Sequence, residues 1–198
     1  MKRYSSGAVI LALLLGRGAG VAFSQGPTST SAGPTSGFRA EYLKELSDIE
    51  KRIVSLAEMV PAEKYTWRPG EGVRSVSEVY LHMATVTFYY PRWVGTPEPA
   101  GFNPRGFDTS TSEKAKVVAT LKDSFAHARR AILNLSDADA DKQMKWIRGE
   151  NTYRGFLLYM TRHLGEHLGQ SIAYARINGI VPPWTEEQQR LQQQQKKQ

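Results

Sequence analysis

Apolar side chains recur at intervals of three and four residues in four long segments of this chain, at residues 38–60, 76–89, 117–135 and 153–177. That spacing places the apolar side chains along one face of an α-helix, which must bury that face against other elements. Four amphipathic helices in a chain of 198 residues predict one all-α domain, a four-helix bundle. No segment alternates apolar and polar residues convincingly, so we expect no β-sheet.

Residues just before or after these segments predict where the helices begin and end. Ser75 and Glu78 have the spacing of a capping box at the start of the second helix. Ser110 and Glu113 have the same spacing before the third helix, and we expect a second capping box there. Pro61 is expected to end the first helix.

Two connections between the helices are long. Residues 95–111 are rich in glycine and proline, and they form either the lid or rim of a functional site or a plain crossover between helices. Residues 136–151 are polar and are expected to form a turn and a short helical start. Tyr89, Trp93 and Arg154 are candidates for lining the mouth of a pocket.

The two ends of the chain lie outside the predicted bundle. Residues 1–24 combine a basic start, an apolar run over 8–15 and a small-residue cleavage site, which is typical of a secretory signal peptide. Residues 25–36 are expected to be a flexible linker, residues 37–184 the bundle, and residues 185–198 a Gln-rich polar tail. We therefore expect an exported protein, periplasmic or extracellular, without a stable membrane span after cleavage; an uncleaved anchor is the alternative.

The charge and the cysteine content of the chain exclude several classes of function. The formal net charge is +7, and removal of Lys2, Arg3 and Arg17 with the signal peptide leaves +4. The basic residues are dispersed along the chain, so a nucleic-acid partner is not expected. The chain has no cysteine, which excludes thiolate ligands and cysteine nucleophiles. A metal would be held by His, Asp, Glu or water.

Two of the four histidines, His163 and His167, are four residues apart in the fourth segment. Side chains at that spacing share one helix face, with Cβ atoms about 5–6 Å apart, so both imidazoles can reach one metal ion. His82 lies on the apolar face of the second segment and is expected to be the third inward histidine. Three nitrogen ligands leave a coordination position open, as in catalytic metal sites. His127 falls on the polar side of the third segment, and we expect it to be exposed and without a role.

The order and spacing of several short motifs resemble the DinB-like superfamily over about residues 37–184. The matching motifs are Trp67-x-Pro69, Ser75-Val76-x-Glu78, Leu81-His82, His163-x-x-Glu166-His167-x-Gly169-Gln170, Tyr174, Asn178-Gly179 and Pro182-Pro183. This resemblance implies a four-helix bundle with a three-histidine site for a divalent metal, typically zinc or nickel. Characterised members include metal-dependent transferases that use low-molecular-weight thiols. The predicted export signal departs from those members, which are cytosolic.

Two residues of the fourth segment are candidates for orienting the ligands. Gln170, three residues after His167, is the better candidate, since a metal-bound imidazole usually needs a partner on its other nitrogen. Glu166 is expected to be a solvent-facing or ligand-orienting carboxylate. The spacing H-x-x-E-H also occurs in a class of zinc proteases, but that class needs a distal acidic ligand, and only residues 168–198 follow.

Three functions fit these observations. The first is a metal-dependent transferase or hydrolase that acts on a small molecule. The second is a non-catalytic exported bundle that binds a metal or another ligand. The third is a structural bundle whose histidines satisfy one another. Bundles of this kind often pair through a helix face, so a homodimer is one expected state.

Overall fold

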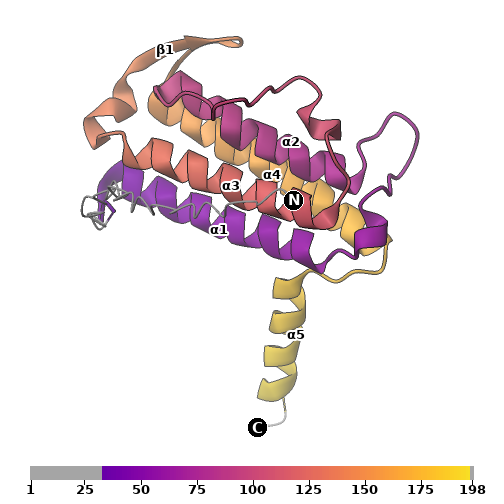
Figure 1. Cartoon of the computed structure of the whole chain (residues 1–198). Helices are drawn as coiled ribbons and strands as arrows, with labels where there is room; N and C mark the ends of the chain where they lie inside the picture. Colours follow the sequence, from indigo (N-terminus) through magenta and orange to yellow (C-terminus); the bar gives the residue numbers. More distant parts are fainter. Residues whose placement is uncertain (1–32, 197–198) are drawn as a thin grey trace, which may run out of the picture. The chain divides into compact units, whose positions relative to one another are not determined.

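The four expected helices run alongside one another in the computed structural model, which describes residues 33–196 (Figure 1). They are α1 (Gly37–Met59), α2 (Val76–Tyr89), α3 (Lys114–Leu133) and α4 (Tyr153–Ile177). Short 3₁₀ helices lie in the connections, namely η1 (Ala62–Lys64), η2 (Tyr90–Val94), η3 (Phe107–Thr109) and η4 (Asp137–Asp141). The prediction of a mainly helical four-helix bundle is confirmed.

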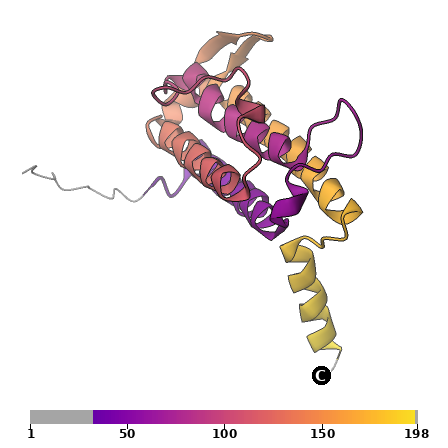
Figure 2. The same cartoon turned by 45° about the vertical axis from the view of Figure 1, so that its right-hand side comes forward.

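The packing order of the helices differs from their order in the chain. Each of α1 and α2 packs against both α3 and α4, so α1 and α2 occupy opposite corners of the bundle. Figure 2 shows the same arrangement from a second direction. Because consecutive helices are not always neighbours, the chain needs long connections, and one of these connections carries η3 to the side of α2.

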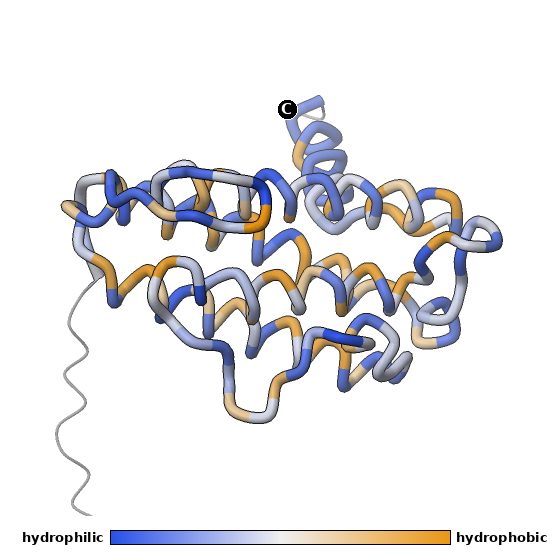
Figure 3. Tube along the Cα trace, turned by 90° about the horizontal axis from the view of Figure 1, so that it is seen from above, coloured by the Kyte–Doolittle hydropathy of each residue, from blue (hydrophilic) through white to orange (hydrophobic). Residues whose placement is uncertain are grey.

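The apolar stripes of the four helices meet in one core. Its largest fully buried members come from all four helices and from the connection after α1: Tyr65, Tyr80, Phe125, Phe156, Leu46, Ile53 and Leu121. Hydrophobic positions recur along each of the four bundle helices, whereas the last helix is mostly hydrophilic (Figure 3). Burial of one large apolar side chain contributes about 1.5–3 kcal/mol, so these stripes supply the main stabilisation of the fold.

A small β-hairpin precedes α4, so the expectation of no β-sheet is wrong, and residues 136–151 contain two strands besides the expected short helical start. Its strands are β1 (Gln143–Trp146) and β2 (Gly149–Thr152), paired antiparallel with Trp146 opposite Gly149. In β1 the side chains of Met144 and Trp146 face the bundle and their neighbours face solvent. A strand of four residues contains only two periods of that alternation, which is too few to distinguish a strand from a loop in the sequence.

The capping box predicted at Ser75 is present. The backbone N–H of Glu78 donates to the Ser75 hydroxyl, and the backbone N–H of Ser75 donates to a Glu78 carboxylate oxygen at 2.8 Å. The second predicted box is wrong, because α3 begins at Lys114 and Ser110 does not cap it. Instead, the Ser110 hydroxyl donates to the carbonyl of Phe107 at 2.8 Å and closes the turn of η3. The Ser110 side chain therefore stabilises the turn of η3, although its spacing from Glu113 predicts that it caps α3.

The prediction that His127 is exposed is also wrong. Its side chain is buried, with 5% relative exposure, and its ring lies 5.9 Å from the ring of Phe88 on α2. The core stripe of α3 defines only one buried face, but α3 contacts both α1 and α2 and therefore buries a wider arc. Within residues 33–196, the Nε2 atom of His127 has no hydrogen-bond partner.

The predicted tail begins inside a helix. Helix α5 spans Pro183–Gln195, and the guanidinium of Arg52 lies 5.6 Å from the ring centroid of Trp184 in its first turn. The later residues of α5 are exposed. None of the helices in the described part of the chain is long and apolar enough to span a membrane. The predicted signal peptide and most of the predicted linker lie outside the described residues.

The capping box should contribute measurably to stability. We expect Ser75→Ala to lower the free energy of unfolding by about 1 kcal/mol, because it leaves a backbone donor at the start of α2 without its acceptor. Urea denaturation followed by circular dichroism measures this loss. Ser110→Ala is the matched control and should cost less, since Ser110 caps no helix; equal losses for the two variants would contradict the assignment.

Candidate metal centre

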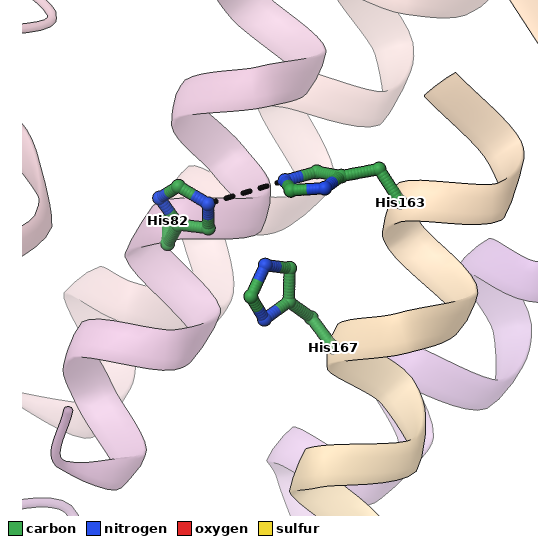
Figure 4. A group of neighbouring side chains, drawn as sticks. All are labelled: His82, His163 and His167. Atoms are coloured by element: carbon green, nitrogen blue, oxygen red, sulfur yellow. Dashed lines mark hydrogen bonds between the residues drawn. The ribbon is translucent and has the colours of Figure 1, made fainter. Parts of the chain in front are cut away.

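Three imidazole rings meet between α2 and α4. His82 comes from the middle of α2, and His163 and His167 come from successive turns of α4 (Figure 4). One ring nitrogen from each histidine can be chosen so that the three nitrogens all lie within 4.8 Å of one another. All three residues are partly buried. The structure thus brings together the three histidines that the sequence singled out.

The distances between the rings fit a shared divalent ion. The Nε2 atoms of His82 and His163 are 3.2 Å apart. Two nitrogens that each lie about 2.0–2.1 Å from a tetrahedral zinc ion are separated by about 3.3 Å. The ring of His167 completes the group, with its centroid 4.7 Å from that of His82 and 4.6 Å from that of His163. Neutral imidazole nitrogens are donors that zinc and nickel accept readily.

The second nitrogen of two rings is held by an oxygen acceptor. The Nδ1 atom of His82 lies 2.9 Å from a carboxylate oxygen of Asp108, and Nδ1 of His167 lies 2.9 Å from the amide oxygen of Gln170. A carboxylate can only accept, so the proton of His82 belongs on Nδ1 and its Nε2 carries a lone pair. The same tautomer follows for His167. These acceptors therefore leave Nε2 of both rings free to bind an ion.

Asp108 is the residue of this centre that the sequence did not identify. It lies in η3, within the glycine- and proline-rich connection, and its other carboxylate oxygen accepts from the Thr85 hydroxyl at 2.8 Å. Arg74 donates to the oxygen that faces His82, at 3.2 Å. Burial opposes ionisation of Asp108, but the hydrogen bonds from His82 and Thr85 and the charges of His82 and Arg74 hold the pKa of the carboxyl below its usual value. Asp108 is therefore a carboxylate at neutral pH.

The partner of His167 is fixed by a further chain of hydrogen bonds. The amide nitrogen of Gln170 donates to the Tyr174 hydroxyl at 2.9 Å, and that hydroxyl donates to the backbone carbonyl of Arg74 at 3.1 Å. The direction of this chain requires the amide oxygen of Gln170 to face His167. Gln170 thus lies where an orienting residue is needed. This chain joins α4 to the residues that precede α2.

Glu166 contacts the centre only loosely. One of its oxygens lies 3.5 Å from Nδ1 of His163, and the other pairs with Arg162 one turn earlier on α4. Its side chain is 51% exposed. At that distance the carboxylate acts on His163 mainly as a nearby charge. The solvent-facing position expected for Glu166 agrees with this geometry.

The residues predicted to line the pocket mouth make the following contacts in the described part of the chain. Arg154 pairs with Asp141 and lies over the ring of Phe38. Tyr89 and Trp93 pack edge to face against each other.

Two other tyrosines lie beside the centre. The ring centroid of Tyr90 is 6.2 Å from that of His163, and the ring centroid of Tyr159 is 6.1 Å from it, with the two rings within 14° of parallel. Tyr159 is four residues before His163, so the i, i+4 spacing that indicated the histidine pair also indicates Tyr159.

The environment of His163 and His167 lowers the pKa of both rings. Burial, followed by the neighbouring imidazoles of His167 and His82, lowers the pKa of His163 to about 4. Burial also lowers the pKa of His167, with further contributions from the charges of His82 and Arg74. Each protonated ring would repel its neighbours across a few ångströms. At neutral pH, His163 and His167 therefore have unprotonated nitrogens, which is the form that binds metals.

Comparison with known proteins bears on this centre. The family model described as the DinB superfamily matches residues 45–171. A comparison with curated protein sequences gave no match.

Several solved structures share the fold. A DinB-like protein from Bacillus cereus is 14% identical, with a TM-score of 0.64 over 72% of this chain and 93% of that one. A DinB-like protein from Bacillus subtilis, YjoA, is 16% identical, with a TM-score of 0.58 over 71% and 93%. YfiT from Bacillus subtilis is 14% identical, with a TM-score of 0.57 over 75% and 98%; it is described as a probable metal-dependent hydrolase with an unusual four-helix bundle topology.

The depressed pKa of His163 predicts how the metal-free protein responds to acid. The unfolded chain protonates this histidine near its ordinary pKa of 6.5, whereas the folded chain does so only near pH 4. Its contribution to stability is therefore present above about pH 6.5 and is lost as the pH falls through about 4. We expect the free energy of unfolding, measured by urea denaturation, to decrease over this range.

A variant without the titrating group should decrease less. His163→Gln removes the ionisable ring and should flatten the decrease in the free energy of unfolding. Lys44→Gln changes an exposed side chain of α1 and leaves all three histidines in place, so it should keep the decrease of the original protein. Parallel pH profiles for His163→Gln and the original protein would contradict the assignment.

Proposed function

The chain belongs to the DinB superfamily, and from that premise we propose that it binds a divalent metal ion through His82, His163 and His167 and acts with it on a small molecule. One observation carries the proposal. The Nε2 atoms of His82 and His163 face each other at 3.2 Å, while Nδ1 of His82 is already bonded to Asp108. That arrangement leaves a lone pair directed at the common point of the three rings.

The chemistry proposed for the site follows from its donor set. Three imidazoles are neutral ligands, and they suit zinc or nickel. When bound, such an ion supplies Lewis acidity, which polarises a substrate and lowers the pKa of water or a thiol that coordinates it. A ligand set of three protein nitrogens also leaves room for that additional group.

The residues around the ligands have separate tasks in this proposal. Asp108 keeps the proton of His82 on Nδ1 and compensates part of the positive charge of an ion. Gln170 does the same for the tautomer of His167 without adding charge. The rings of Tyr90 and Tyr159 form an aromatic border beside His163 that limits access of bulk water on that side. Such outer contacts typically fix ligand geometry and affinity.

We favour hydrolysis over thiol transfer as the reaction. YfiT, which shares the fold, is described as a probable metal-dependent hydrolase. The predicted signal peptide supports the same choice, because low-molecular-weight thiol cosubstrates are cytosolic whereas water is available in any compartment. Export itself belongs to this proposal: the N-terminal sequence of the secreted protein should begin at Gln25, and a mature protein that begins at Met1 would contradict it.

Replacement of the ligands is the principal test. We expect the protein to bind one equivalent of zinc in isothermal titration calorimetry, and His82→Ala, His163→Ala and His167→Ala each to abolish that stoichiometric binding. His127→Ala is the matched control, since His127 is buried elsewhere in the bundle and should leave zinc binding unchanged. If all four variants bind zinc alike, the proposed site is wrong.

The role of Asp108 gives a second test. We expect Asp108→Asn to weaken zinc binding by about 10- to 100-fold, because an amide nitrogen facing His82 favours the tautomer that protonates Nε2. Competition with a chelating dye measures the dissociation constant. Asp137→Asn is the control and should leave the constant unchanged, because it changes a carboxylate of η4 that accepts a hydrogen bond from the backbone N–H of Arg39 in α1. Equal affinities for both variants would exclude a role for Asp108.

A further inference from the structure

The hairpin before α4 carries an arginine that has no acidic partner among the residues that the structure describes. Arg148 lies in the two-residue turn between β1 and β2, where its neighbour Ile147 is 82% exposed. The arginines of α4 nearby, Arg154 and Arg162, pair with Asp141 and Glu166. Within residues 33–196, no carboxylate lies within ion-pair distance of Arg148. Its positive charge is therefore not neutralised by an ion pair.

Aromatic rings hold this guanidinium beside the histidine centre. It lies 5.2 Å from the ring centroid of Tyr159 and 5.9 Å from that of Trp146. Trp146 in turn packs against Tyr159, with centroids 4.8 Å apart. A guanidinium over an aromatic face loses little freedom when it then binds a ligand, because its plane is already oriented.

The same aromatic surface continues into the proposed metal centre. Tyr159 lies one helical turn before His163, and their rings are nearly parallel. Figure 1 shows the hairpin over the end of the bundle where α2 ends and α4 begins. A continuous path therefore runs from the guanidinium of Arg148, across the ring of Tyr159, to the ring of His163 in the centre. Arg162, also over Tyr159 at 4.9 Å, adds a second guanidinium that is already paired.

We propose that Arg148, Trp146 and Tyr159 form a binding site for a substrate that joins an oxyanion, such as a carboxylate or phosphate, to an apolar or aromatic body. Arg148 binds the oxyanion with its forked donors, and the rings of Trp146 and Tyr159 pack against the body. This inference rests on the proposed function only for the reaction at the other end of the substrate. The binding site itself consists of residues that do not ligate the ion.

A matched pair of small probes tests the site. Phenylacetate and its neutral amide, phenylacetamide, differ in charge but have nearly the same shape. Titration of the protein, followed by NMR shifts of its tryptophan and tyrosine signals, gives a dissociation constant for each probe. We expect phenylacetate to bind at least about tenfold more tightly, as for a hydrogen bond to a charged group.

The titration is performed on the protein after chelation and again with zinc. Chelation removes any direct contact between the probe and an ion, so a preference that persists belongs to the side chains. Arg148→Ala should remove the preference for phenylacetate and leave the weak binding of phenylacetamide unchanged. Arg190→Ala, on exposed helix α5, is the control and should keep the preference of the original protein.

The outcomes separate this inference from the proposed function. Equal binding of the two probes, or a preference that survives Arg148→Ala, overturns the proposed substrate class. Zinc titration of the same Arg148→Ala protein reports on the metal centre independently, and its zinc affinity should equal that of the original protein. Loss of zinc binding in the original protein would overturn the proposed function while leaving an Arg148-dependent preference after chelation intact.

Discussion

The burial of three imidazoles between α2 and α4 imposes the strictest physical requirement on this protein. Each ring has two nitrogens that need partners, and two protonated rings at such short range would repel each other in a poorly solvated site. The structure meets this requirement by lowering the pKa of His163 and His167, by placing acceptors on Nδ1 of His82 and His167, and by directing Nε2 of His82 toward His163. A metal ion is a partner that could still bind the Nε2 lone pairs in this arrangement.

The helices and the connections contribute differently to the centre. Helices α2 and α4 deliver the three rings, because packing of their apolar faces fixes how close the two backbones come. The connection after α2 delivers Asp108, and the residues before α2 deliver Arg74 and the carbonyl that ends the chain from Gln170 through Tyr174. The ligand geometry thus depends on the core, and the charge around the ligands depends on segments outside it.

The sequence was sufficient for those features that helical periodicity determines. The four helices, the inward direction of His82, His163 and His167, and the position of Gln170 beside His167 all follow from the repeat of 3.6 residues. Asp108 could not be found in this way, since its position depends on how a long connection folds back onto α2. The β-hairpin was missed because its strands are too short to show alternation, and with it the position of Trp146 beside Tyr159.

The error at His127 has the same origin. The sequence of α3 shows one apolar stripe, but α3 contacts two helices, and the second contact buries His127 against Phe88. A pattern in one helix cannot show how many neighbours that helix has. Periodicity therefore predicts the direction of a side chain more reliably than its burial.

The attachment of Asp108 to a segment outside the four helices has a consequence for how proteins of this architecture can diverge. Phe102 and Phe107 pack against Phe88 and so attach that segment to α2 through side-chain contacts. Insertions, deletions or an exchanged acid in the segment could alter the basicity of His82 while every helix and every ligand stayed in place. One scaffold could in this way acquire sites of different Lewis acidity, without the loss of stability that changes in a packed core entail.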